Sequence, residues 1–575
     1  IIKKFSQNNL YTDAAIKNII DYYIKNSSAA NRLDIINYFI KLSNDYKPEA
    51  PLLSARLLFE AANIANSINE NYLAKKLLYQ LINDFKFTDL SNDAYIKLGD
   101  IYFAEQDYEN SFKSYFSAIS LNYSDATEER RRLALEKYKQ KMFEKGDYEQ
   151  KIKDYQKAYK TFFKLIEFDK GYVPAYRELI KLGAMLNQLP ELENLINSYK
   201  TQKLTIVEHS AIEYAEALIL TYQKNWKNNL NAALKKVQGA ISLKKNVSYY
   251  YQLAGWILEQ LELQADKYGK YEDSLNNYKI ALGLADPENI QNRAELIMNI
   301  ANVYYHLQNY EFAYRYYAEY EKLSANLKYQ DKNILEIFYA NYAYSAYVIN
   351  LYELAEKNYR RAIELTNNAE HKEMYYKKLS LIYYSSARFL EAVQALETAN
   401  SIAVDTKNLS AAELELRKYY NNRAILLYLM NYLKEHPEIS ELEKAKLKNK
   451  IIELLEKTEQ HFNLGFQQLK AKKEGLINLR INIADEGTDN AEGFNPTTEQ
   501  KFLYMLASGF YQFYNNNQKS IDYLKKRLEL LPQKIIIDKM PIAALEQAIL
   551  LNSIGIEYYR INDWKNSIDY IDSSL

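Results

Sequence analysis

A recurring pattern of small and aromatic residues constrains the fold of this chain more than any other feature. At least eight segments carry the pattern, and the clearest copy is Leu98, Gly99, Tyr102, Ser111, Tyr115 and Ala118. The same offsets return in Tyr342, Ala343, Ala346, Ala355, Tyr359 and Ala362, and again in Leu379, Ser380, Tyr383, Ala392, Leu396 and Ala399. Internal repeats with such constant offsets are typical of stacked structural units that each contact only their neighbours.

Each copy has the composition of two packed helices. A small residue at the centre of the first helix and an Ala or Ser in the first turn of the second let the two backbones approach closely, while large aromatics fill the grooves beside them. Neither helix can bury its apolar stripe alone, so successive pairs must stack. The chain has 575 residues, which is more than one compact core holds, because such cores stop growing near ~250–300 residues. Only 9 Pro and 14 Gly are present, which argues against several globular domains joined by linkers.

The pattern resembles the tetratricopeptide repeat (TPR) family, in which Leu-Gly and Tyr mark the first helix and Ala, an aromatic and Ala mark the second. Further copies centre on Ala62, Ala254, Ala301, Ser508 and Gly555, and a looser copy carries Ala158, Phe162 and Leu165 after a first helix that is hard to frame. The resemblance implies an all-α fold, a TPR-like superhelical solenoid of stacked antiparallel helix pairs. The spacing departs from the family's ~34 residues, since it is 37 from Ala62 to Gly99 and 47 from Ala254 to Ala301.

The organisation along the chain follows from where the pattern holds. We expect five parts: degenerate N-terminal helices or a cap over 1–50, the solenoid over 51–435, a long charged helical segment over 436–482, a polar loop over 483–499, and truncated repeats over 500–575. The charged segment has an apolar stripe formed by Leu447, Ile451, Leu454, Leu455 and Phe462. The polar loop is the best candidate for a hinge or an exposed interaction loop.

The residue combinations that catalysis and metal binding require are missing from the sequence. The absence of cysteine removes thiol nucleophiles and thiolate metal sites. The five histidines lie far apart, and neither HExxH nor a phosphate-binding glycine loop occurs. The segment from Asp485 to Pro496 lacks the closing Glu and the turn glycine of a calcium loop. We therefore predict a protein that is not an enzyme and has no cofactor, metal or small-molecule substrate.

Tyrosines provide the candidate binding surface. A helical residue one position past the groove-filling aromatic points about 100° away from it, and in TPR-like stacks this direction faces the concave channel. The residues on this face are Phe103, Tyr305, Tyr347, Tyr384 and Tyr559, with Tyr344 one turn before Tyr347. Such rings offer a flat apolar area and a hydroxyl, which suits protein binding. The alternative is that the rings are buried against an adjacent repeat.

Charge limits the choice of partner. Lys and Arg total 74, as do Asp and Glu, whereas a nucleic-acid binder usually carries a basic excess. The triplet Arg130–Arg131–Arg132 follows Glu128 and Glu129, which favours a solvated helix face over an anion site. We therefore predict a non-enzymatic scaffold that binds other proteins, as a structural component of a large bacterial assembly. A soluble peptide-binding adaptor or chaperone is the first alternative to a scaffold, and an RNA-binding helical repeat is the second.

The location is predicted from composition and resemblance. The absence of cysteine fits an oxidising compartment, and it fits a cysteine-poor genome equally well. With its repeats and AT-rich coding bias, the chain is similar to the TPR-type collar proteins of spirochaete flagellar motors. That similarity implies a periplasmic location, with a cytoplasmic one as the alternative, and other motor scaffold or stator proteins as partners. The chain looks like a fragment and has no apolar run near ~20 residues, so we expect membrane contact only through an anchor outside it.

Overall fold

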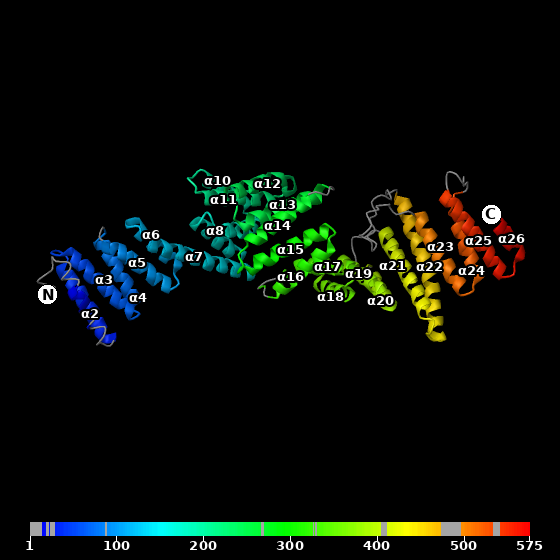
Figure 1. The fold of residues 1–575 in the computed structure, drawn as a ribbon, viewed down its shortest axis with the longest axis horizontal. Coiled ribbons are helices and arrows are strands. Elements are labelled where there is room, and N and C mark those ends of the chain that lie inside the picture. Colours follow the sequence, from blue (N-terminus) through cyan, green and yellow to red (C-terminus); the bar gives the residue numbers. More distant parts are fainter. Residues whose placement is uncertain are drawn as a thin grey trace. The chain divides into compact units, whose positions relative to one another are not determined.

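The computed structural model describes residues 14–18, 22, 29–86, 89–265, 270–325, 327, 331–403, 411–472, 496–532 and 541–575. Over these residues the only regular secondary structure is helical. The chain divides into two compact units, residues 1–260 and 261–575. Within each unit, consecutive helices lie side by side in pairs, and pairs pack on pairs (Figure 1). The predicted all-α fold of stacked antiparallel helix pairs is confirmed.

The first unit contains eleven helices with the following bounds in the described residues. They are α2 (Ala29–Tyr46), α3 (Pro51–Ser67), α4 (Asn71–Asp84), α5 (Asp89–Ala104), α6 (Tyr108–Leu121), α7 (Asp125–Lys151), α8 (Tyr155–Phe168), α9 (Val173–Met185), α10 (Leu189–Lys200), α11 (Ile206–Tyr222) and α12 (Trp226–Leu243), of which α2 precedes the first complete pair. The next helix, α13 (Ser248–Ala265), spans the boundary between the units.

The second unit continues with α14 (Lys270–Leu284), α15 (Ile290–His306), α16 (Tyr310–Ser324), α17 (Lys332–Val348), α18 (Tyr352–Leu365), α19 (Ala369–Ser385) and α20 (Phe389–Ala403). It ends with α21 (Ala411–Glu435), α22 (Glu441–Lys472), α23 (Pro496–Phe513), α24 (Asn517–Glu529), α25 (Pro541–Arg560) and α26 (Trp564–Ser574). A core runs from the α17/α18 pair to α23 and includes Ala343, Tyr383, Leu426 and Phe510.

One turn closes nine of these helix pairs. Directly before the second helix of each pair, one non-glycine residue has a left-handed backbone with φ between 54° and 64°; these residues are Asn69, Gln106, Lys153, Asn187, Gln308, Asn350, Ala387, Asn515 and Asn562. In the α5/α6 turn, the N–H of Asp107 donates to the carbonyl of Tyr102 at 2.9 Å, and the Asp107 side chain caps α6. Asn is common at this position because its short polar side chain tolerates the left-handed region. Because the same turn recurs, the first and second helices meet at equivalent positions in all nine pairs.

Small residues stand where the two helices of a pair touch. A Cβ on Gly99 of α5 would lie 2.6 Å from Cδ1 of the Tyr115 ring on α6, so only hydrogen fits there. Gly146 has the same relation to Phe162, since its Cβ would lie 2.6 Å from Cζ of that ring. Gly146 thus identifies the first helix of the looser repeat as α7. This helix has 27 residues, against 16 in α5, and the spacing from Gly99 to Gly146 is accordingly 47 residues, longer than the family's ~34.

In the first unit two helix pairs were not predicted by the repeat pattern, and in the second unit α21/α22 has no copy of it either. In α9/α10 the large residues Ile180 and Leu192 occupy the positions that small residues hold elsewhere, seven before and five after the left-handed Asn187. The α11/α12 pair lacks the left-handed turn, and α11 begins with a capping box formed by Thr205 and Glu208. Packing of apolar faces therefore produces a helix pair without the small-residue signature.

The charged segment forms part of the second unit's core. Its helix α22 packs along α21, and Ile451, Leu455 and Phe462 of the predicted stripe are buried in the same core as α19 and α23. Leu447 and Leu454 pack partly buried against that core. Of the predicted N-terminal cap, the structure describes α2 and a few residues before it, while 473–495, including most of the predicted polar loop, lie outside the described residues.

Candidate protein-binding surface

Five of the six predicted surface rings, all except Tyr344, pack against the first residue of the following helix, five positions later. The ring centroids are 5.2 Å apart for Phe103 and Tyr108, 5.7 Å for Tyr305 and Tyr310, 6.1 Å for Tyr347 and Tyr352, 5.7 Å for Tyr384 and Phe389, and 4.8 Å for Tyr559 and Trp564. The left-handed turn between the helices brings the two rings together. The second ring of each pair was not predicted from the sequence. An aromatic residue five positions after each of these rings was the pattern that could have identified it.

In the second unit three of the predicted tyrosines join one continuous group of rings, which we call the aromatic strip: Tyr305, Tyr310, Tyr344, Tyr347 and Tyr352. Tyr305 and Tyr310 both meet Tyr344 edge-on, with centroids 5.8 Å and 5.4 Å apart. Tyr344 in turn lies 6.4 Å from Tyr347 on the same helix. Edge-to-face pairs at these distances are favourable beyond their burial. The strip therefore runs without interruption over α15, α16, α17 and α18.

Polar groups of α19 border the strip. The hydroxyls of Tyr347 and Ser385 are 3.4 Å apart, and the Lys378 ammonium lies 4.9 Å from the centre of the Tyr344 ring. The rings of Tyr305, Tyr344 and Tyr347 are partly exposed, so they contact neighbouring repeats and solvent at once.

The other predicted residues lie outside the strip. Tyr384 stacks on Tyr428 of α21 at 4.5 Å, and its hydroxyl accepts a hydrogen bond from Asn431 at 2.9 Å. Phe103 belongs to the first unit, on α5. Tyr559 is on α25, where 55% of it is exposed. Of the six residues, Tyr305, Tyr344 and Tyr347 are therefore the three that the structure brings together.

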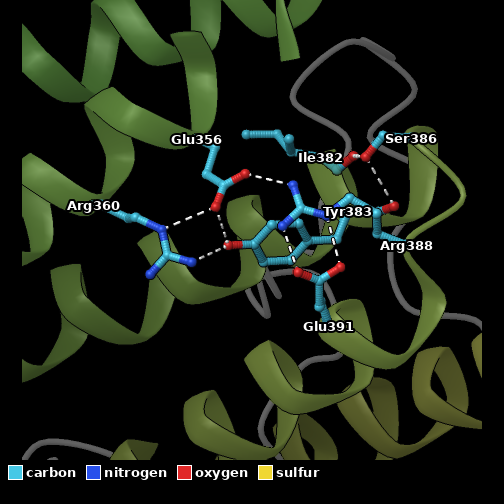
Figure 2. Close-up of polar contacts among 7 residues, drawn as sticks. All are labelled: Glu356, Arg360, Ile382, Tyr383, Ser386, Arg388 and Glu391. Atoms are coloured by element: carbon cyan, nitrogen blue, oxygen red, sulfur yellow. Dashed lines mark hydrogen bonds and ion pairs between the residues drawn. The ribbon is translucent and has the colours of Figure 1, made fainter. Parts of the chain in front are cut away.

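An ionic cluster fastens α18 to α19 and to the start of α20 (Figure 2). Glu356 accepts hydrogen bonds from Arg388 at 2.6 Å, from the Tyr383 hydroxyl at 2.9 Å and from Arg360 at 3.0 Å. Arg388 also binds Glu391 through both nitrogens of its fork. Burial opposes the charge on Glu356, but the hydrogen bonds from Arg388, Tyr383 and Arg360 outweigh it and hold the pKa of this carboxyl below its ordinary value.

A second ionic group is buried between α19 and α21. The Glu373 side chain is 1% exposed and pairs with Lys377 at 2.6 Å and with Arg417 at 2.9 Å. Burial lowers the pKa of Lys377, although the neighbouring carboxylate of Glu373 favours its charged form. The buried charge of Glu373 is thus balanced by the charges of Lys377 and Arg417, as buried ions require. The two ionic clusters hold the helix pairs that border the strip in a defined register.

The basic triplet of α7 has carboxylate partners. Arg130 pairs with Asp100 at 2.9 Å, Arg131 with Glu128 at 2.6 Å and Arg132 with Glu129 at 3.6 Å. These pairs match the predicted solvated face, and they leave little net positive charge for phosphate binding. Arg130 and Asp100 join α7 to α5, so part of the triplet stabilises the packing of neighbouring repeats.

Neither a metal site nor a membrane-spanning helix is formed by the residues that the structure describes. They contain no group of three or more His, Asp or Glu side chains arranged to hold a metal ion. Among the helices that the structure describes, none combines the length and the apolar character needed to cross a membrane. The segment with partial likeness to a calcium loop, 485–496, lies almost entirely outside the described residues.

The shared turn, the close helix contact and the stacking of pairs define a TPR-like α-solenoid. No family model matches the sequence, and no curated protein matches it. YrrB, described as a TPR protein with an unusual peptide-binding site, is 14% identical over 42% of this chain and 91% of its own, with a TM-score of 0.27. The C-terminal part of a TPR repeat-containing protein from Cytophaga hutchinsonii is 15% identical over 46% and 96%, with a TM-score of 0.30. The APC/C hetero-tetramer Cut9–Hcn1 is 13% identical over 73% and 76%, with a TM-score of 0.33.

Proposed function

We propose that this chain is a non-enzymatic scaffold that binds a protein partner along the aromatic strip. The observation that supports the proposal is the continuity of partly exposed tyrosine rings over four successive helices, from Tyr305 to Tyr352. Tyrosine is enriched at interaction hot spots because it combines a large apolar area with a hydroxyl. The strip offers this chemistry as one surface.

The strip is also preorganised. Edge-on contacts between neighbouring rings and the ionic cluster around Glu356 hold the side chains and the helix pairs in place before any partner arrives. A rigid surface loses little conformational entropy on binding, so more of the contact energy appears as affinity. Binding by a scaffold that presents a fixed surface is therefore favoured over binding by a segment that folds around its ligand.

The decisive experiment blocks the strip without removing its rings. Ser385 is exposed and lies beside Tyr347, so Ser385→Arg places a long charged side chain at the edge of the strip. Gln394→Arg is the matched control, because Gln394 is exposed on α20, the second helix of the same pair. A photo-reactive amino acid at Ile337, which is 52% exposed and two helical turns before Tyr344, identifies the partner by cross-linking.

We expect Ser385→Arg to reduce the yield of the cross-linked partner at least fivefold, and Gln394→Arg to leave it unchanged. Circular dichroism of both variants shows whether the helices persist. Equal cross-linking in the two variants would refute binding at the strip. A partner captured as one short peptide would favour the adaptor alternative over a scaffold, which should capture folded proteins.

The proposed cellular location is the periplasmic collar of a bacterial flagellar motor. Its support is the absence of cysteine and the similarity of repeats and composition to TPR-type collar proteins. In this setting the partners are other scaffold or stator proteins of the motor. Fluorescent fusions of the full-length protein in its native host should localise at motors, and deletion should disturb collar assembly. Cytosolic fusions together with normal motors in the deletion strain would rule the location out.

A further inference from the structure

The outer face of α12, in the first unit, carries positive charge with no acidic residue nearby in the sequence. Between positions 217 and 258 the chain has six lysines and neither aspartate nor glutamate, although the two signs are equally frequent over the whole chain. Four of these lysines are exposed, namely Lys224, Lys227, Lys235 and Lys245. Solvated helix faces commonly mix charges of both signs, so this face differs from an ordinary exposed surface.

Elsewhere in the structure, exposed cations are neutralised by a carboxylate on the same or a neighbouring helix. On α6, Lys113 pairs with Glu109 one turn away at 2.8 Å. Lys236 of α12 pairs with Glu213 and Glu216 of α11 at 3.4 Å and 2.9 Å. In the part of the chain that the structure describes, none of the four exposed lysines forms an ion pair. Their charges are therefore available to an outside ligand.

The exposed residues of α12 lie on one stripe. They recur every three or four positions, which places them on the side opposite the residues that α12 buries against α11. The stripe consists of Lys227, Asn231, Lys235, Gln238 and Ser242. It is ~22 Å long, and its two lysines are eight residues or ~12 Å apart along the helix axis.

Two tryptophans lie at the start of the stripe. The rings of Trp226 and Trp256 are 5.7 Å apart, and the ammonium of Lys227 lies 5.8 Å from the centre of the Trp226 ring. Both indoles are partly exposed. Because tryptophan is enriched at the hot spots of protein interfaces, the face offers an apolar anchor beside its charges.

We propose that the outer face of α12 binds an acidic segment of a partner protein. Carboxylates ~12 Å apart along the segment face Lys227 and Lys235, and an apolar side chain contacts Trp226. The amides of Asn231 and Gln238, which lie between and beyond the charges, can donate and accept hydrogen bonds with polar groups of the segment.

Two other anionic ligands fit this face less well. Nucleic acids present phosphates much more densely than one per ~12 Å and are often recognised through arginine, whereas positions 217–258 contain no arginine. Binding in a membrane interface requires a helix face with apolar side chains, whereas this stripe has amide and hydroxyl groups between its lysines. A protein carboxylate is the anion that matches the spacing and the surroundings of the lysines.

The test uses the full chain and a phage-displayed library of peptides of about 15 residues, the length of the stripe when helical. The library is selected on the wild type and counter-selected on the double variant Lys227→Glu/Lys235→Glu. Enriched peptides should be acidic and should have an apolar residue toward one end. Titration by fluorescence anisotropy at about 50 mM and about 300 mM salt then gives their affinities.

We expect the double reversal to weaken the enriched peptide at least about tenfold at the lower salt concentration and by less at the higher one. A peptide whose acidic residues are changed to lysine should bind the double variant and lose affinity for the wild type. Lys137→Glu/Lys160→Glu is the matched control, because both are exposed lysines of the same unit and form no ion pair among the described residues. It changes the net charge equally and should alter the affinity less than about twofold.

Three results would overturn the proposal: no enrichment, enriched peptides without acidic residues, or an equal loss of affinity in the control variant. Single-stranded RNA of about 12 nucleotides and vesicles with about 30% phosphatidylserine are titrated in parallel. Tighter binding of either one that depends on Lys227 and Lys235 would assign the face to phosphate groups and would likewise overturn it. The aromatic strip belongs to the second unit, so failure here is separate from failure of the proposed function.

Discussion

Tyr383 of α19 donates a hydrogen bond from its phenol to Glu356 of α18 across 2.9 Å, while the guanidinium of Arg388 lies 4.5 Å from the centre of its ring. The repeat pattern predicted Tyr383 as a residue that fills the groove between helices, and its ring is buried as expected. Its polar tip has a second role, because it closes an ionic cluster that joins consecutive helix pairs. Burial, followed by the hydrogen bond to Glu356, raises the pKa of Tyr383 to about 12.

This cluster predicts a stability change at acidic pH. The pKa of Glu356 is lower in the folded protein than its ordinary value of 4.5, so its contribution to stability is present above pH 4.5 and is lost as pH falls through the folded pKa. Glu356→Gln should cost about 2 kcal/mol near neutral pH, since hydrogen bonds to charged groups are lost. The difference in stability between the variant and the wild type should be smaller at about pH 3.5 than at about pH 6.5, as measured by urea unfolding.

Glu453 provides the control for this experiment. It is an exposed carboxylate paired with Lys457 on α22 of the same unit, so Glu453→Gln changes one charge without opening an interface between repeats. Its effect should be small at both pH values. If Glu356→Gln destabilised the protein equally at both pH values, the ionic cluster would not be the source of the loss.

The contact between the two helices of a pair predicts which glycines cannot be replaced. Gly99→Ala forces a methyl group into the Tyr115 ring and should destabilise the first unit by about 1–3 kcal/mol, the range for overpacked cores. Gly509 is the matched control, since it lies within α23 and a Cβ there would meet no atom within 4 Å. Gly509→Ala should stabilise the second unit by up to about 1 kcal/mol through helix propensity. Urea midpoints of the two variants should therefore move in opposite directions.

The same steric rule explains how far the sequence predicted this structure. Small residues such as Gly99 reveal a helix pair because no larger residue fits at the contact, and most pairs were predicted for this reason. The α9/α10 pair was missed because Ile180 and Leu192 stand at the positions where the pattern has small residues, while the glycine that meets Leu192 is Gly183, three positions after Ile180, where a Cβ would lie 2.6 Å from Leu192 Cδ1. Of the candidate surface, the pattern predicted Tyr305, Tyr344 and Tyr347, but the pairing with Tyr310 and Tyr352 depends on the turn, which no single residue type specifies.

The turn itself yields a third prediction. Ala387 has φ of 58°, a left-handed conformation that costs a residue with a Cβ roughly 1–2 kcal/mol. Ala387→Gly removes that strain and should raise the stability of the second unit by about 1 kcal/mol, although glycine also has a more flexible unfolded state. Asn350→Gly at the equivalent turn should gain less, because asparagine tolerates this region. Thermal unfolding of both variants measures the difference, and a loss of stability in Ala387→Gly would contradict the assigned strain.

The aromatic strip predicts an energetic coupling between repeats. Tyr305 and Tyr344 meet edge-on at 5.8 Å, so replacing both by Leu should cost less than the sum of the two single replacements, by about 0.5–1.5 kcal/mol. Each cost comes from urea unfolding under one set of conditions. Tyr305 and Tyr384 form the control pair, because Tyr384 packs instead on Tyr428 and Phe389. Their replacements should be additive within about 0.5 kcal/mol. Equal coupling in the Tyr305/Tyr344 and Tyr305/Tyr384 pairs would mean that each replacement loosens the whole unit. The strip would then not be the rigid surface that binding of the proposed partner requires.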